Sequence, residues 1–248
     1  MEMNLDWLLD KFIAHKGFHN ETIPENSLPA FANAIENGYA IELDVRMLAD
    51  KNIAVFHDKE LGKTTGQDGY ISMLTTEDLV NYKLNGTEEH IPTLREALDL
   101  IAGQTPVVID IKVESSHIGV LESELYNIIK DYDGRIAVMS FNPLTIEWFK
   151  KNAPEIPRGL LSTKWDKKVP ADEKPDTWVK RFVTSHNILR KRADPHFLAY
   201  NVLHLPSRQV KKFKGITLLG WVVKSQEQYL DKVQLVDNII FEGFEPKI

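Results

Sequence analysis

Short apolar runs rich in β-branched residues recur along the chain and alternate with stretches of helical periodicity. These runs cover residues 12–14, 39–45, 107–113, 136–141, 158–161, 197–202, 217–223 and 238–241. Eight strands alternating with helices predict a parallel sheet, and this strand count in 248 residues favours a (β/α)8 TIM barrel. The sequence lacks the glycine-rich dinucleotide fingerprint that would favour an open doubly wound sheet.

Two of the predicted helices have clear boundary signals. Ser27 can cap a helix that tolerates Pro29 in its first turn. Thr93 and Glu96 form a capping box at the start of a second helix, and Gly103 is placed to end it.

A ninth strand-like run, residues 53–57, closely follows the second strand. The connection is too short for a parallel crossover, so we expect an antiparallel hairpin. Symmetric folding about residues 50–51 would place His57 opposite Asp44. We expect one catalytic TIM-barrel domain over residues 1–248, with the hairpin and a small insertion within it at 47–92.

Two neighbouring strands carry charged residues on one face. Glu42, Asp44 and Arg46 alternate with apolar residues in the second strand, as Asp110 and Lys112 do in the strand at 107–113. Both faces of a strand in a parallel barrel are covered, so ionised groups there are costly unless they are paired or bind a metal. The pattern predicts an oxygen-rich site for a hard cation such as Mg²⁺ or Ca²⁺.

Two histidines are expected beside these carboxylates. His15 ends the first strand, and the hairpin brings His57 close to Asp44. An imidazole with a pKa of about 6.5 can act as general acid or general base near neutral pH. With a metal ion, Lys16 and Lys112 to neutralise charge, this arrangement indicates displacement at phosphorus.

The composition narrows the class of protein. A net charge of −6 argues against nucleic-acid binding, and the absence of cysteine excludes thiolate chemistry and disulfides. The N-terminal residues lack the pattern of a secretory signal, and no apolar run approaches the roughly 20 residues needed to cross a bilayer. We therefore expect a cytoplasmic protein without an integral membrane segment; no oligomeric state is implied.

Several motifs, taken in order, resemble those of the glycerophosphodiester phosphodiesterase family. In the first half of the chain they are His15-Lys16-Gly17, Pro24-Glu25-Asn26-Ser27, Glu42-Leu43-Asp44-Val45, Val55-Phe56-His57-Asp58, Lys63-Thr64-Thr65 and Ile91-Pro92-Thr93-Leu94. The second half agrees more loosely, at Ser140-Phe141-Asn142-Pro143, Gly220-Trp221-Val222-Val223 and Asp237-Asn238-Ile239-Ile240. The family fold is a TIM barrel with a small insertion after the second strand, as the spacing predicts independently.

The resemblance implies hydrolysis of glycerophosphodiesters to glycerol 3-phosphate and an alcohol, an activity of lipid and glycerol metabolism that uses one divalent metal ion, Mg²⁺ or Ca²⁺. By matched motif, His15 and His57 would be the acid and base, in either order, while Glu42 and Asp44 would be metal ligands. A substrate hydroxyl would attack phosphorus to give a cyclic glycerol phosphate, which water would then open.

Two positions depart from the family pattern. The third metal ligand of the family is a glutamate, and the corresponding residue here is the shorter Asp110; Glu114, on the same face, is the alternative. Lys16 stands where the family usually has arginine, so it keeps the charge but loses the bidentate fork for a phosphate. We still expect Lys16 and Lys112 to bind substrate.

Other residues bear on the choice of substrate. Trp221 lies near the end of the strand at 217–223, and we expect it at the rim, where it could pack on a substrate carbon chain; Phe141 is a weaker candidate. Plain packing within the barrel or against a helix is the alternative for both. His19 matches no catalytic position of the family, and we interpret it as a loop residue.

Two alternative functions remain. A lysophospholipase D-like phosphodiesterase would need an apolar path at the mouth of the barrel. That path would be built by Tyr70, Ile71, Met73, Leu74 and Trp221. A non-catalytic phosphodiester-binding barrel would account for Lys16 and Asp110, but retention of both histidines argues against it.

Overall fold

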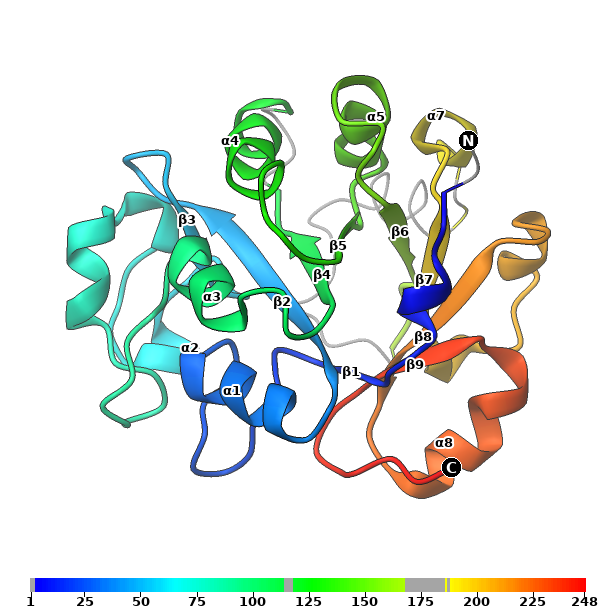
Figure 1. The fold of residues 1–248 in the computed structure, drawn as a ribbon, viewed down its shortest axis with the longest axis horizontal. Coiled ribbons are helices and arrows are strands. Elements are labelled where there is room, and N and C mark those ends of the chain that lie inside the picture. The colour runs from blue at the N-terminus through cyan, green and yellow to red at the C-terminus, as the bar shows by residue number, and fades with distance from the viewer. Residues whose placement is uncertain (1–2, 114–117, 168–185, 187) are drawn as a thin grey trace.

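The computed structural model describes residues 3–113, 118–167, 186 and 188–248, and within this part eight parallel strands close into a barrel (Figure 1). The strands are β1 (Ile13–Ala14), β2 (Ala40–Met47), β4 (Val107–Ile111), β5 (Ile136–Ser140), β6 (Arg158–Ser162), β7 (Phe197–Asn201), β8 (Thr217–Val223) and β9 (Asn238–Phe241). The barrel closes because β1 pairs with both β2 and β9. The predicted TIM barrel is confirmed, and each predicted run overlaps a strand.

Helices form a layer around the strands (Figure 1). The α-helices are α1 (Leu28–Glu36), α2 (Gly62–Thr65), α3 (Leu94–Ile101), α4 (Val120–Ile129), α5 (Pro143–Asn152), α7 (Arg190–Ala193) and α8 (Gln226–Lys232). The 3-10 helices are η1 (Asp6–Leu8), η2 (Ile71–Met73), η3 (Thr76–Asn81), η4 (Val202–His204), η5 (Val210–Lys212) and η6 (Val233–Leu235). Among the described residues, no helix has both the length and the apolar character required to span a membrane. The expected cytoplasmic location stays a prediction.

Both predicted helix starts are confirmed. The Oγ of Ser27 accepts a hydrogen bond from the Ala30 N–H at 3.3 Å. The Glu96 N–H donates to Thr93 Oγ1 at 3.2 Å, and the Thr93 N–H donates to Glu96 Oε2 at 2.7 Å, which completes the capping box. These caps satisfy backbone donors that have no partner within the helix.

Two hydrophobic cores lie on opposite sides of the strands. Outward-facing residues, such as Ile41 and Leu43 of β2, pack in one cluster with residues of the surrounding helices. The second cluster fills the inside of the barrel. Its strand members are Ile13, Ala40, Val108, Ala137, Met139, Leu161, Phe197, Ala199, Leu219 and Ile240. The two-residue period of β2 therefore turns Glu42 and Asp44 to the inside, in line with Ala40.

The predicted hairpin is confirmed, but its register differs by one residue. β3 (Ile53–Val55) runs antiparallel to β2, with Val45 opposite Val55. The Phe56 N–H donates to the Asp44 carbonyl at 3.0 Å, so Phe56 rather than His57 lies opposite Asp44. The observed pairs centre the turn on Asp50, whereas the expected centre was between residues 50 and 51. Within this turn Lys51 adopts a left-handed conformation with φ of 66°.

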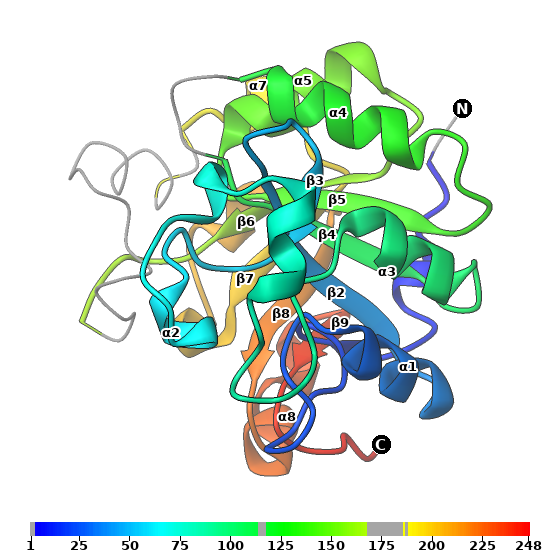
Figure 2. The same cartoon turned by 90° about the vertical axis from the view of Figure 1, so that its left-hand side faces the viewer.

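The segment after β3 has a small core of its own. Figure 2 shows the ribbon of this segment beside β2 and β3. Its buried members include Leu61, Ile71 and Leu74, which pack with Phe56. Ile71 and Leu74 are therefore unavailable for an apolar path at the barrel mouth, whereas Tyr70 and Met73 are exposed to solvent. We propose that residues 47–92 are one insertion unit within a single catalytic domain.

Candidate active site

Three carboxylates from two adjacent strands meet inside the barrel. Glu42 and Asp44 project from β2, and Asp110 of β4 is the direct neighbour of Asp44 in the sheet. All three side chains are buried, and one carboxylate oxygen from each lies within 4.8 Å of the others. The structure thus brings together the three residues that the sequence predicts as metal ligands.

Lys112 is the principal cation beside these carboxylates. Its Nζ lies 2.6 Å from Asp110 Oδ2 and 2.9 Å from Asp44 Oδ1. Burial alone lowers the pKa of Lys112, but the charges of Asp110 and Asp44 outweigh burial and raise this pKa above its ordinary value. Lys112 therefore stays charged and offsets part of the negative charge of the cluster.

The three carboxyl groups titrate differently. Burial raises the pKa of Glu42 well above its ordinary value, and repulsion from Asp44 and Asp110 adds to the rise. Burial is also the main cause of the raised pKa of Asp110. For Asp44, burial is outweighed first by Lys112 and then by His57, which hold the pKa below its ordinary value. Repulsion among the carboxylates therefore persists although Lys112 lies beside them.

The donor set fits a divalent cation. Asp110 Oδ1 is buried and has no hydrogen-bond partner among the described residues. A buried carboxylate oxygen without a partner is costly, and a hard cation would satisfy it. Three carboxylates are the ligand type that Mg²⁺ and Ca²⁺ prefer. The alternative ligand, Glu114, lies outside the described residues.

His15 lies directly after β1 and is fixed by a carboxylate from the neighbouring strand end. Its Nδ1 is 2.9 Å from Glu242 Oε2, and its Nε2 is 3.9 Å from Glu42 Oε2. Burial lowers the pKa of His15, and the hydrogen bond with Glu242 offsets part of this. With Nδ1 held by Glu242, Nε2 is the ring atom left for proton transfer on the side of Glu42.

His57 is likewise held through its Nδ1 by a carboxylate. Its Nδ1 is 2.7 Å from Asp58 Oδ1. Its carbonyl accepts a hydrogen bond of 2.7 Å from the Nε of Arg46, which is on the same face of β2 as Glu42 and Asp44. The structure brings His15 and His57 to the same carboxylates, each with a carboxylate on Nδ1.

The loop after β1 contributes through its backbone and through Asn26. The Lys16 N–H donates to Glu42 Oε2 at 2.9 Å, in a left-handed conformation with φ of 56°. The Lys16 Nζ lies 2.7 Å from Glu25 Oε1, so its charge is already paired. Asn26 Nδ2 donates to Asp44 Oδ2 at 2.9 Å. This loop therefore orients both carboxylates of β2.

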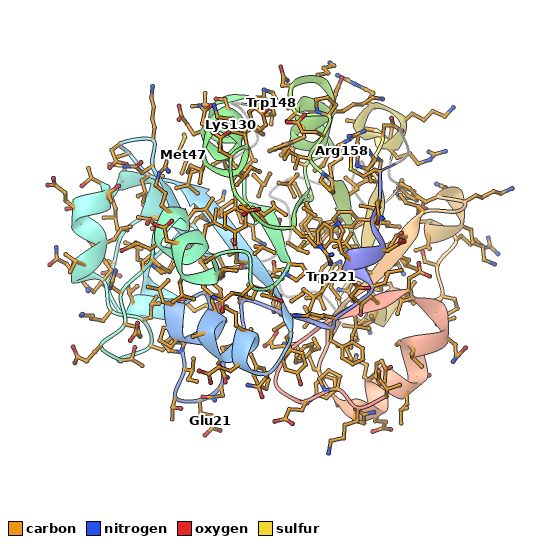
Figure 3. All side chains as sticks on the ribbon, viewed as in Figure 1. Glu21, Met47, Lys130, Trp148, Arg158 and Trp221 are labelled. Atoms are coloured by element: carbon orange, nitrogen blue, oxygen red, sulfur yellow. The ribbon has the colours of Figure 1, made fainter. Side chains whose placement is uncertain are left out.

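Aromatic side chains border the charged cluster. Trp221 lies toward the middle of the ring of strands and helices in Figure 3, and its ring centroid is 5.5 Å from that of Phe141. Phe141 in turn lies 5.1 Å from Trp165. Met139 of β5 is opposite Asp110, and Phe141 directly follows β5. We call Phe141, Trp165 and Trp221 the aromatic wall.

Sequence reasoning assigned no role to several residues that complete the site. Asp58, Asn26 and Glu25 stand within the quoted motifs, so their proximity to the assigned residues was a usable signal. Glu242 had a weaker signal, since it lies two residues beyond Ile240 and continues the inward face of β9.

Comparison with known proteins places this geometry in a family. Residues 15–241 match the model of the Glycerophosphoryl diester phosphodiesterase family. A glycerophosphodiester phosphodiesterase from Caldanaerobacter subterraneus is 33% identical over 95% of both chains. Lysophospholipase D GDPD1 from Rattus norvegicus is 31% identical over 50% of this chain and 42% of its own length. A phosphodiesterase from Oleispira antarctica, solved with the product sn-glycerol-3-phosphate, superposes with a TM-score of 0.77 at 24% identity, covering 95% of this chain and 93% of that one.

Proposed function

The chain belongs to the glycerophosphoryl diester phosphodiesterase family, and we propose that it hydrolyses glycerophosphodiesters to glycerol 3-phosphate and an alcohol with one divalent ion, Mg²⁺ or Ca²⁺. The observation that carries this proposal is the cluster of three buried carboxylates flanked by two histidines, each with its Nδ1 held by a carboxylate. The name of the Caldanaerobacter relative supports the same substrate class.

Glu42, Asp44 and Asp110 would hold the metal ion in this proposal. When bound, the ion would neutralise charge at the phosphoryl group and make the attacking hydroxyl easier to deprotonate. Asn26 fixes the Asp44 carboxylate and the Lys16 N–H fixes that of Glu42, so two of the ligands are oriented before metal binds.

His15 and His57 would move the protons. One imidazole removes the proton of the attacking glycerol hydroxyl as its oxygen bonds to phosphorus, and the other protonates the leaving alcohol as its bond to phosphorus breaks. The products are a cyclic glycerol phosphate and the free alcohol. Water then opens the cyclic ester, with the two imidazoles exchanging roles, and glycerol 3-phosphate is released.

Lys16, Lys112 and Trp221 would bind the substrate. Lys112 adds positive charge close to the phosphoryl group, and the Lys16 ammonium, paired with Glu25, adds a second. Trp221 and the rest of the aromatic wall offer an apolar surface for the carbon chain of the leaving alcohol.

The alternative of a lysophospholipase D-like activity uses the same chemistry on a lipid. The name of the rat relative and the aromatic wall favour this reading. Burial of Ile71 and Leu74 in the core of the insertion disfavours it, because they do not extend the apolar surface. We therefore rank glycerophosphodiesters first. A binding-only barrel is ranked last, since it would not need carboxylates on both histidines.

A product-release assay tests the proposal. Purified protein is incubated with glycerophosphocholine or with lysophosphatidylcholine, plus Mg²⁺ or Ca²⁺, and glycerol 3-phosphate and choline are measured separately. We expect metal-dependent release of glycerol 3-phosphate from the first substrate, abolished by chelator. Faster release of choline from lysophosphatidylcholine would favour the alternative, and no release from either would favour a binding-only barrel.

A further inference from the structure

His19 lies in the loop between β1 and α1, where sequence analysis gave it no function. Its Nε2 is buried, and it has no hydrogen-bond partner among the described residues. Such a buried nitrogen costs about 1–3 kcal/mol unless it is satisfied. The interpretation of His19 as an ordinary loop residue does not account for this atom.

The backbone on both sides of His19 is held in place. The Phe18 N–H donates to the Ala30 carbonyl at 2.9 Å, and the Phe18 carbonyl accepts from Asn33 Nδ2 at 2.6 Å. The Asn20 N–H donates within the loop, to the Ile23 carbonyl at 3.0 Å. The loop is thus anchored to α1, and the backbone at His19 has a defined position.

The charged residues around His19 are those of the active site. Burial is the largest influence and lowers the pKa of His19, while the charges of Glu242 and Glu25 raise it and those of His15 and Lys16 lower it. These four neighbours are already paired, His15 with Glu242 and Lys16 with Glu25. Of this group, only His19 lacks a partner among the described residues for its buried nitrogen.

Building on the proposed function, we propose that His19 is a substrate-binding residue whose Nε2–H donates a hydrogen bond to a non-bridging oxygen of the phosphoryl group. Lys16 offers one compact charge, which is already held by Glu25, and it cannot supply the two parallel N–H donors of an arginine. His19 lies beside Lys16 in the same loop and supplies the second directed donor.

The contacts of His19 separate this role from those of the other two histidines. His15 and His57 each have a carboxylate on Nδ1, which orients an imidazole for proton transfer. The described residues form no hydrogen bond with the ring of His19. His19 is therefore assigned to binding and not to acid–base catalysis.

The test compares His19→Phe, which keeps ring volume, with His19→Gln, which retains an N–H donor. The dissociation constants of inorganic phosphate and sn-glycerol 3-phosphate are measured by calorimetry on metal-loaded protein. We expect His19→Phe to weaken both by roughly 5- to 30-fold, with a similar rise in KM and kcat changed by less than about threefold. His19→Gln should recover most of the binding.

A matched control and a stability measurement exclude indirect effects. His90→Gln alters a histidine of the insertion, whose Nε2 is 3.7 Å from Oε1 of Glu96 in α3, and this variant should bind both anions like the wild type. The thermal midpoint of His19→Phe should not fall, since the substitution removes a nitrogen that has no hydrogen-bond partner among the described residues. A lower midpoint without recovery by His19→Gln would assign His19 a structural role and overturn the inference.

The remaining outcomes separate this inference from the proposed function. Wild-type protein that binds both anions, more tightly than His19→Phe, but releases no glycerol 3-phosphate would contradict the function and keep the inference. Wild-type protein that hydrolyses glycerophosphocholine while His19→Phe matches its constants would contradict the inference alone. Wild-type protein that binds neither anion would contradict both.

Discussion

The two ends of the barrel are built from alternate inward residues of the same strands, yet they hold opposite kinds of side chain. Val108 lies at the N-terminal end of β4, and Asp110, two residues later, joins the carboxylate cluster. Ile240 of β9 packs in the apolar interior, and Glu242 contacts His15. Inward positions only two residues apart on a strand therefore belong to the apolar core in one case and to the candidate site in the other.

The polar groups at the two ends are also satisfied differently. At the N-terminal end, Leu8 of η1 packs in the inner core, and Asn238 Nδ2 donates to the carbonyls of Leu8 at 2.6 Å and Lys11 at 2.8 Å. At the C-terminal end, Asp110 Oδ1 and His19 Nε2 are buried without a partner among the described residues. These buried polar atoms without partners lie where ligands would bind. We call the N-terminal end, with its apolar core, the packed end, and the C-terminal end, with the carboxylate cluster, the charged end.

The largest expected effect lies at the packed end. Phe197 is fully buried, and its ring fills the space beside Gly159, where an added Cβ would approach it to 2.2 Å. Phe197→Ala should lower the free energy of unfolding by about 3–5 kcal/mol, measured by urea denaturation. The kcat of the remaining folded protein should change little; a hundredfold loss of kcat at full folding would break the separation between the ends.

The next effect belongs to the charged end. His15→Ala and His57→Ala should each lower kcat by about 10²-fold or more, because each removes a proton-transfer group. His90→Ala, in the insertion, is the matched control and should keep wild-type rates. If both active-site variants kept wild-type turnover under saturating metal, the acid–base assignment would be wrong.

A smaller effect concerns the third metal ligand. Asp110→Asn should weaken metal affinity by about 10- to 100-fold, and Glu114→Gln should weaken it less. Both affinities can be measured by calorimetric titration with Mg²⁺ or Ca²⁺. The reverse ranking would transfer the ligand role to Glu114.

The smallest effect returns to the packed end. Burial, and then the charge of Arg158, lowers the pKa of His196 to about 4, and its Nδ1 accepts a hydrogen bond of 3.3 Å from the Arg158 N–H. The unfolded chain binds this proton near pH 6.5, so the contribution of His196 is complete above that pH and is lost as the pH falls towards about 4. His196→Gln should reduce the drop in thermal midpoint between pH 7 and pH 5 by, at most, a few degrees. An unchanged drop would show that the imidazole does not contribute.

Much of the fold followed from the sequence, because strand period and capping are local properties. All eight barrel strands and the Thr93 capping box follow directly from residue patterns. The hairpin register depended on whether Lys51 adopts a left-handed conformation, which the alternation of residues does not specify. The burial of Ile71 and Leu74 depends on packing within the insertion, and the sequence of the insertion has no regular hydrophobic period that would predict it.

The site was predictable to the extent that it lies on strands. Glu42, Asp44 and Asp110 are placed by the two-residue period of β2 and β4 and by the pairing of these strands. Residues in loops were less accessible, because their positions follow from backbone hydrogen bonds formed only in the fold. His19 and the pairing of Lys16 with Glu25 are of this kind.

Direct metal titration tests the central claim, that the charged end is a metal site which the packed end supports without taking part. Metal-free wild-type protein is titrated with Mg²⁺ and with Ca²⁺ in a calorimeter, beside Asp44→Asn from the charged end and Val108→Ala from the packed end. We expect one ion per chain for wild type and for Val108→Ala, and no measurable binding for Asp44→Asn. Equal binding by Asp44→Asn and wild type, or no binding by wild type, would contradict it.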